Sequence, residues 1–170
     1  MESNNLINKI KSCIKDNKTD IPNLVEILKN CGLENFNINL KYDEKKYTRN
    51  LIFKNNDFQL VIMCWPINFE SSIHDHNGSE CFFKILKGVM LEKKYEIFGE
   101  KLKLTNDNII TESSVSFLEN NNDIHQVKNI HNNFVITLHL YVPFYQKTNV
   151  YQLKENNKFA KKIIELSFDN

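Results

Sequence analysis

The sequence lacks the features that mark several large classes of protein. Its 4 cysteines have neither the spacing of a zinc-binding motif nor the density of a disulfide-rich secreted domain. No apolar run approaches the roughly 20 residues that a membrane-spanning helix requires. Lys9, Lys11 and Lys15 interrupt the N-terminal segment, where a secretory signal peptide would need an apolar core. These absences favour a cytoplasmic protein.

An excess of charge is missing too. The chain has 22 basic and 21 acidic residues, which gives a formal net charge of +1 at pH 7, so nothing indicates nucleic acid or a membrane surface as a partner. Its 170 residues are enough for one domain with a substantial core. We therefore expect a single domain over 1–170 that acts as a monomer, with a helical part at 1–35 and a β part at 36–170.

Glycine is scarce as well, with only 4 in the chain, whereas asparagine is abundant. Asparagine adopts the left-handed backbone conformation more readily than most residues. We therefore expect asparagine at turn positions that glycine usually fills.

Hydrophobic spacing predicts two helices near the N-terminus. Leu6, Ile10 and Ile14 recur every four residues, which is typical of an amphipathic helix. Asp20 is a suitable N-cap for a second helix, which we expect to end at Gly32.

From about residue 36 the apolar spacing changes to that of β-strands. Short apolar runs alternate with turns rich in Asn, Asp and Gly, as in an antiparallel sandwich or barrel. We expect a mainly β protein, a double-stranded β-barrel of the jelly-roll type preceded by short helices. The predicted strands are 48–53, 58–65, 70–76, 81–87, 89–98, 108–111, 115–118, 124–130, 133–141 and 161–168. The predicted loops include 55–57, 106–107 and 120–123.

Two histidines stand out in the middle of the chain. His74 and His76 are two residues apart, so in an extended strand both side chains point to one face while Asp75 points to the other. Asn77-Gly78 follows, and this pair is a strong signal for a tight turn. Two imidazoles on one wall of a barrel are suited to hold a metal ion, although a pair of surface histidines on an edge strand would give the same pattern.

His125, early in a predicted strand, is the best candidate for a third ligand, whereas His131 lies in a predicted turn. Three neutral imidazoles leave a divalent ion its full charge and leave open coordination positions. The usual oxygen-activating iron site replaces one imidazole with a carboxylate. A site of three histidines therefore suits a substrate that brings its own anion, such as a thiolate.

Two further strands carry polar residues on one face. Thr137, His139 and Tyr141 alternate with leucines, and such a polar ladder is costly to bury unless it is hydrogen-bonded or faces a polar cavity. Tyr47 and Arg49 share a face at the start of another strand. The guanidinium of an arginine can bind a carboxylate through two hydrogen bonds, although an exposed arginine is the ordinary alternative.

Taken together, these segments resemble the thiol dioxygenases of the cupin superfamily, and most closely the cysteine dioxygenases. The resemblance runs from Tyr47 to Tyr141 and is weaker outside that range. Its five motifs stand in the family's order and at family-like spacing, which makes the set far more specific than any one of them. They are Tyr47 to Leu51, Cys64-Trp65, Ser71 to His76 with Cys81 following, Ile124 to Asn129, and Leu138 to Tyr141.

The resemblance implies an enzyme that oxidises L-cysteine with O2 to cysteine sulfinate at one Fe(II) ion. It assigns the metal to His74, His76 and His125. It assigns the substrate carboxylate to Arg49, aided by Tyr47. It also implies that Cys81 and Tyr141 form a thioether crosslink and take part in catalysis, and that His139, with Thr137, orients Tyr141. Trp65 matches a residue near the cavity, although a core aromatic residue would fit equally well.

Several departures from the family pattern leave alternatives open. Asn68 and Asn122 stand near places where cupins carry glycine, and a family cysteine near the cavity mouth is replaced around Thr148. If the strand register turned Glu80 inward, the site would have three histidines and one glutamate, and the Cys81 crosslink would be lost. The alternatives are a dioxygenase for another small thiol or an N-terminal cysteine, a different metal-dependent cupin, and a cupin that only binds a ligand.

Overall fold

The computed structural model describes residues 3–15, 18–119 and 123–169. The helices are α1 (Ser3–Cys13), α2 (Ile21–Lys29) and the short 3-10 turns η1 (Leu33–Asn35) and η3 (Glu155–Asn157). The strands are β1 (Ile14–Lys15), β2 (Lys18–Thr19), β3 (Thr48–Lys54), β4 (Gln59–Trp65), β5 (Ile73–His74), β6 (Glu80–Lys87), β7 (Met90–Phe98), β8 (Lys101–Ile110), β9 (Val115–Leu118), β10 (Ile124–Asn129), β11 (Val135–Val142), β12 (Lys147–Leu153) and β13 (Phe159–Glu165).

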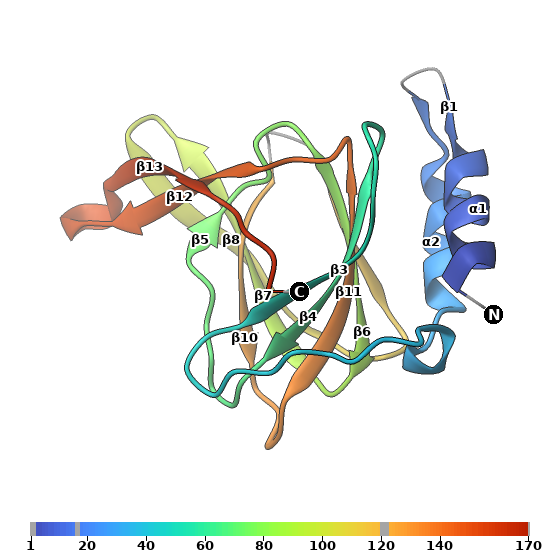
Figure 1. The fold of residues 1–170 in the computed structure, drawn as a ribbon. Coiled ribbons are helices and arrows are strands. Elements are labelled where there is room, and N and C mark those ends of the chain that lie inside the picture. The colour runs from blue at the N-terminus through green and yellow to red at the C-terminus, as the bar shows by residue number, and fades with distance from the viewer. Residues whose placement is uncertain (1–2, 16–17, 120–122, 170) are drawn as a thin grey trace.

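Two sheets make up the body of the fold (Figure 1). One has the strand order β13-β12-β5-β10-β7-β8, and the other has the order β3-β4-β11-β6-β9. The named strand pairs are antiparallel, and many neighbours in the sheets are distant in sequence, as β5 and β12 are. The mainly β architecture predicted from the sequence is confirmed.

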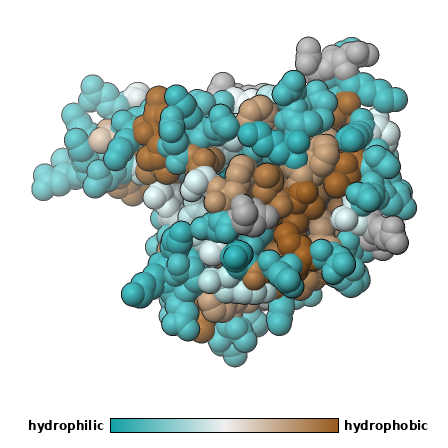
Figure 2. Space-filling view, viewed as in Figure 1, coloured by the Kyte–Doolittle hydropathy of each residue, from teal (hydrophilic) through white to brown (hydrophobic). Residues whose placement is uncertain are grey.

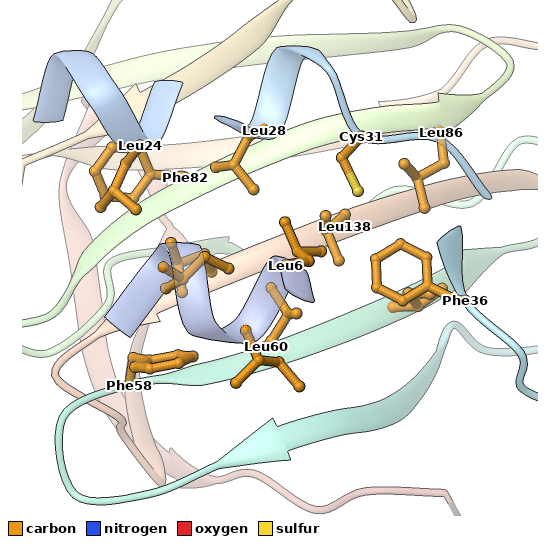
Figure 3. Packing of buried hydrophobic residues seen from close by; sticks show 14 of the residues in the cluster. Leu6, Leu24, Leu28, Cys31, Phe36, Phe58, Leu60, Phe82, Leu86 and Leu138 are labelled. Carbon is orange, nitrogen blue, oxygen red and sulfur yellow. The ribbon is translucent and has the colours of Figure 1, made fainter. Parts of the chain in front are cut away.

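The first helices cover the outer face of the five-stranded sheet, at the right of Figure 1. Leu6 and Leu24 from the helices pack with Leu60, Phe82 and Leu138 from three strands (Figure 3). A buried lysine adds a polar contact, because Nζ of Lys84 on β6 donates to the carbonyl of Lys29 at the end of α2. In the space-filling view, brown hydrophobic surface gathers between the C-terminus and the helices, with hydrophilic residues around it (Figure 2).

Strand alternation separates this outer core from the barrel interior. On β11, Ile136 and Leu138 face the helices, whereas Val135 and Tyr141 belong to the interior cluster. The predicted polar ladder on this strand therefore lies on the inner side, and all eight residues of the strand are buried. The interior between the two sheets is where polar side chains collect.

The predicted and observed strands differ in three places. The predicted strand 70–76 shrinks to β5, because regular pairing covers only Ile73 and His74, while Glu70 forms just an isolated bridge with Lys128. The predicted loop at 106–107 lies within β8, a long strand at the edge of its sheet whose exposed polar side chains hide its pairing with β7. Strand β12 was not predicted because polar residues, Thr148 and Asn149, are buried in it. The predicted loop at 120–123 lies outside the described residues except for its last position.

Both predicted helices are present, but each ends earlier in the chain than predicted. Asp20 caps α2, because its side chain accepts a hydrogen bond from the Asn23 amide at 3.3 Å. Ile14 lies in β1 rather than in α1, and α2 ends at Lys29, ahead of Gly32.

The use of asparagine in left-handed positions is confirmed. Among the described residues, the non-glycine positions with positive φ are all asparagine, namely Asn68, Asn77, Asn156 and Asn157. Asn68 stands near an expected glycine position, as predicted, whereas Asn122 lies outside the described residues.

Candidate active site

The structure brings together three histidines, two from neighbouring strands and one from the turn that follows β5. His74 on β5 is the register partner of His125 on β10, and His76 follows β5 after one residue. One nitrogen from each of the three side chains lies within 4.8 Å of the others. His74 is half-buried, and the other two are almost completely buried.

Hydrogen bonds fix which nitrogen of two of these rings carries the proton. Nδ1 of His74 lies 2.9 Å from the carbonyl of Ser72, and Nδ1 of His125 lies 2.9 Å from Oε1 of Glu92. Both partners accept hydrogen bonds, so each neutral ring carries its proton on Nδ1 and turns a bare Nε2 lone pair to the cluster.

The cluster suits a cation. Nε2 of His74 and Nε2 of His125 are 3.2 Å apart, and two lone pairs at that distance repel each other. Two metal–nitrogen bonds of about 2.1 Å, set at ordinary coordination angles, separate the nitrogens by roughly 3.0 to 3.4 Å. The donor set therefore fits a divalent transition metal.

Burial keeps these rings neutral and available as ligands. It lowers the pKa of His76 and His125 well below the ordinary value of 6.5, and the neighbouring histidines add to the effect. Burial also raises the pKa of Glu92, while a hydrogen bond from Ser116 at 2.8 Å opposes that shift. Glu92 did not stand out in the sequence, because it sits among lysines on β7.

Asp75 holds the histidine segment from the opposite face. Its carboxylate accepts hydrogen bonds from the side chain of Asn149 at 2.9 Å, from Tyr151 at 2.7 Å and from the amide of Asn77 at 2.9 Å. The prediction that Asp75 points away from His74 and His76 agrees with these contacts. They tie the two-residue strand β5 to β12, and no pattern in the sequence indicated this network.

A cavity of about 140 Å³ opens beside the histidines. It is far larger than the roughly 10–15 Å³ that one water requires. Six of the residues predicted for the site line it: Tyr47, Arg49, His74, His125, His139 and Tyr141. Trp65 lines it too, with Tyr47 stacked on its indole at 4.8 Å between ring centroids, and so does Thr148.

Arg49 is the only arginine in the chain, and it is buried with 5% of its surface exposed. Its guanidinium carbon lies 5.8 Å from the ring centre of Tyr141 and 5.4 Å from that of Phe168. The Nε and Nη2 atoms of Arg49 have no hydrogen-bond partner among the described residues. Buried donors of this kind are costly unless a ligand pairs with them, and a carboxylate accepts two such bonds at once.

A chain of hydrogen bonds runs behind the cavity wall to Tyr141. Nε1 of Trp65 donates to Oγ1 of Thr137 at 2.8 Å, and this hydroxyl lies 2.8 Å from Nε2 of His139. Nδ1 of His139 then lies 3.0 Å from the hydroxyl of Tyr141. The polar ladder on β11 is therefore satisfied internally, which explains how it is tolerated inside the barrel.

Cys81 lies directly opposite Tyr141 in the pairing of β6 with β11. A hydrogen bond joins the two side chains, and burial raises the pKa of the Cys81 thiol well above its ordinary value of 9.0. Strand alternation puts Glu80 on the other face, with Phe82, so the alternative register with an inward Glu80 is wrong. Among the described residues, the group of potential metal ligands consists of the three histidines.

His131 lies near Gly88 and outside the cavity lining, as expected for a turn residue. Tyr145, which was not singled out in the sequence, does line the cavity, and its ring packs against Tyr141 and His76. None of the helices in the described parts of the chain is both long enough and apolar enough to cross a membrane.

Comparison with solved structures supports the barrel assignment. A protein of Thermus thermophilus superposes with a TM-score of 0.52 at 15% identity, over 61% of this chain and 90% of that one. The cupin domain of Schizosaccharomyces pombe Cnp3 superposes with a TM-score of 0.50 at 13% identity, over 61% of this chain and 65% of that one. The fold is that of the cupins, as predicted.

Sequence comparison is more specific. A cysteine dioxygenase type 1 of Danio rerio is 34% identical over 117 residues, which are 65% of this chain and 58% of the relative. The cysteine dioxygenase type 1 of Homo sapiens is 32% identical over 123 residues, which are 69% of this chain and 62% of the relative. The chain thus matches about 60% of the length of these relatives. The family model for cysteine dioxygenase type I matches residues 2–154, so the chain belongs to that family.

Proposed function

We propose that this protein is an iron(II)-dependent cysteine dioxygenase that converts L-cysteine and O2 to cysteine sulfinate. His74, His76 and His125 hold the iron, and Arg49 binds the carboxylate of the substrate with help from Tyr47. We further propose that the protein acts in the cytoplasm. We also propose that it acts as a monomer, since one chain supplies every residue that the site uses.

One observation supports this proposal above the others. Three imidazoles, each able to donate a lone pair, meet at the wall of one cavity, and that cavity is also lined by a buried arginine with two N–H groups that no described residue pairs. A small molecule that satisfies both must carry a metal-binding group and a carboxylate. L-Cysteine offers a thiolate, an amine and a carboxylate on one short skeleton.

Iron(II), when bound, supplies the redox chemistry that lets a thiol react with dioxygen. The residues of the chain supply position and charge. Arg49 neutralises the carboxylate, and Tyr141 presents a hydroxyl held by His139 from behind. Both atoms of O2 end on the sulfur of the substrate, so the conversion of thiol to sulfinate needs no external reductant.

A thioether between Cys81 and Tyr141 is part of the proposal. The register pairing and the hydrogen bond between these side chains support it. Such a bond would fix the Tyr141 ring and reduce the ordering required at each turnover.

The test is to load the protein with Fe(II) under anaerobic conditions, add L-cysteine and O2, and identify the product by mass spectrometry. We expect cysteine sulfinate, whose mass exceeds that of cysteine by two oxygen atoms. A panel with cysteamine, 3-mercaptopropionate and a peptide with N-terminal cysteine separates the alternatives, because equal turnover of a thiol without a carboxylate would contradict the role of Arg49. Cysteine binding with no oxidised product would instead indicate a binding protein, and full occupancy by zinc or manganese would indicate another kind of cupin.

A further inference from the structure

Tyr145 is a second phenol at the site. It follows β11 in the short connection to β12, and only 7% of its surface is exposed. Its ring centre lies 4.7 Å from that of Tyr141 and 5.8 Å from that of His76. It lines the same cavity as Arg49, whose positive charge acts on it. The residue therefore borders both the histidines and the guanidinium.

The hydrogen bonds behind the cavity have a direction. The indole of Trp65 can only donate, so Thr137 accepts from it and gives its own proton to Nε2 of His139. A neutral His139 then carries its proton on Nδ1 and donates to the hydroxyl of Tyr141. The proton of Tyr141 is left free for another acceptor.

That acceptor is Tyr145. A hydrogen bond joins the two phenols, and it is the Tyr141 hydroxyl that donates. Arg49 also hydrogen-bonds the Tyr141 hydroxyl and, as a cation, can only donate, so it fills the remaining lone pair, while the sulfur of Cys81 is only a weak acceptor. The chain of donors therefore ends at the Tyr145 hydroxyl, and this residue lines the cavity, so its own proton is available to a bound molecule.

An acceptor for this proton is at hand if the proposed function holds. A carboxylate has about four lone-pair positions, and the unpaired Nε and Nη2 atoms of Arg49 would occupy two of them. We propose that Tyr145 is a further substrate-binding residue, whose hydroxyl donates a hydrogen bond to the carboxylate that Arg49 holds. This inference rests on the proposed function and adds a second determinant of substrate choice to Arg49.

The experiment compares Tyr145→Phe with the parent protein, both loaded with Fe(II) and kept anaerobic. Isothermal titration measures the binding of L-cysteine and of cysteamine, which keeps the thiol and amine but lacks the carboxylate. We expect cysteine to bind about tenfold more weakly to the variant and cysteamine to bind equally well, since one hydrogen bond to a charged group is lost. Tyr95→Phe is the matched control, because Tyr95 is a buried phenol bonded to Gln126 outside the cavity.

A purely structural role predicts a different result. If Tyr145 only supports the Tyr141 ring, Tyr145→Phe weakens the binding of both thiols by the same factor, and the inference is overturned. Unchanged binding of both overturns it as well, while the proposed function stands if the parent protein still forms sulfinate. If the parent protein neither prefers cysteine over cysteamine nor forms sulfinate, the proposed function fails and this inference fails with it.

Discussion

Oε1 of Glu92 lies 2.9 Å from Nδ1 of His125, and both side chains are almost completely buried. The two residues come from the neighbouring strands β7 and β10. The hydroxyl of Ser116 bonds the second oxygen of Glu92 and holds the carboxylate in place. The arrangement fixes the orientation of the His125 ring and leaves its Nε2 free for a metal.

Replacing Glu92 with alanine should therefore weaken the affinity for Fe(II) by about 10- to 100-fold, a factor typical of such outer partners. Glu92→Gln should weaken it less, because the amide oxygen can still accept from Nδ1. A competition titration with a chelator under anaerobic conditions measures the affinity. Glu96→Gln, an exposed change on the same strand, serves as control, and equal affinities in all the variants would show that Glu92 does not support the metal site.

Arg49→Ala should raise the Michaelis constant for cysteine strongly, because a buried charge-assisted contact is worth about 2–5 kcal/mol. The Michaelis constant of Arg49→Lys should lie between those of the parent protein and Arg49→Ala, since lysine keeps the charge but loses the planar pair of donors. Steady-state oxygen uptake with cysteine and cysteamine gives the comparison. Lys46→Ala removes an exposed positive charge near the same strand and should have little effect. An unchanged Michaelis constant in Arg49→Ala would refute the carboxylate role.

The pairing of Cys81 with Tyr141 predicts a measurable covalent change. After turnover with O2 as oxidant, bond formation between the sulfur and the ring removes two hydrogen atoms from the protein. We expect the intact mass of the parent protein to be lower by two hydrogens than the value calculated from its sequence, and Cys81→Ser to show its calculated mass. Peptide mapping should then find β6 and β11 fragments joined. Two unmodified fragments in active protein would exclude the crosslink.

The alternation of residues between the two faces of a strand was the most informative signal in the sequence. The period of two placed Thr137, His139 and Tyr141 on one face of a strand, and the structure has these residues in one hydrogen-bonded row. The same rule predicted the common direction of His74 and His76. It works here because the two faces of β11 meet different surroundings, the helices on one side and the barrel interior on the other.

The parts that could not be predicted depend on contacts between distant segments. Asp75 is separated from Asn149 by 74 positions, and Glu92 from His125 by 33. Strand β12 has no clean alternation, because Asn149 is buried in order to bond Asp75. Polar residues of this kind look exposed in a sequence, and only the tertiary structure reveals their partners.

His139 should make the stability of the metal-free protein depend on pH. Burial lowers the pKa of His139 well below its ordinary value of 6.5, and the positive charge of Arg49 adds to the effect. Below about pH 6.5 the unfolded chain therefore binds a proton here that the folded chain does not. The unfolded state then holds more protons, so the free energy of unfolding falls as the pH falls, whereas above this range the contribution of His139 is constant.

His139→Gln removes the titrating ring but keeps side-chain hydrogen bonding. The remaining buried histidines are present in both proteins, so the difference between the two pH slopes reports mainly on His139 and on its coupling to His76. Urea unfolding at about pH 7.5, 6 and 5 should give a slope that is smaller in the variant by up to about 1.4 kcal/mol per pH unit, the value for one proton. Equal slopes would mean that His139 binds its proton equally in the folded and unfolded states. The imidazole would then not be held neutral behind Tyr141, and the direction assigned to the hydrogen bonds from Trp65 to Tyr145 would lose its basis.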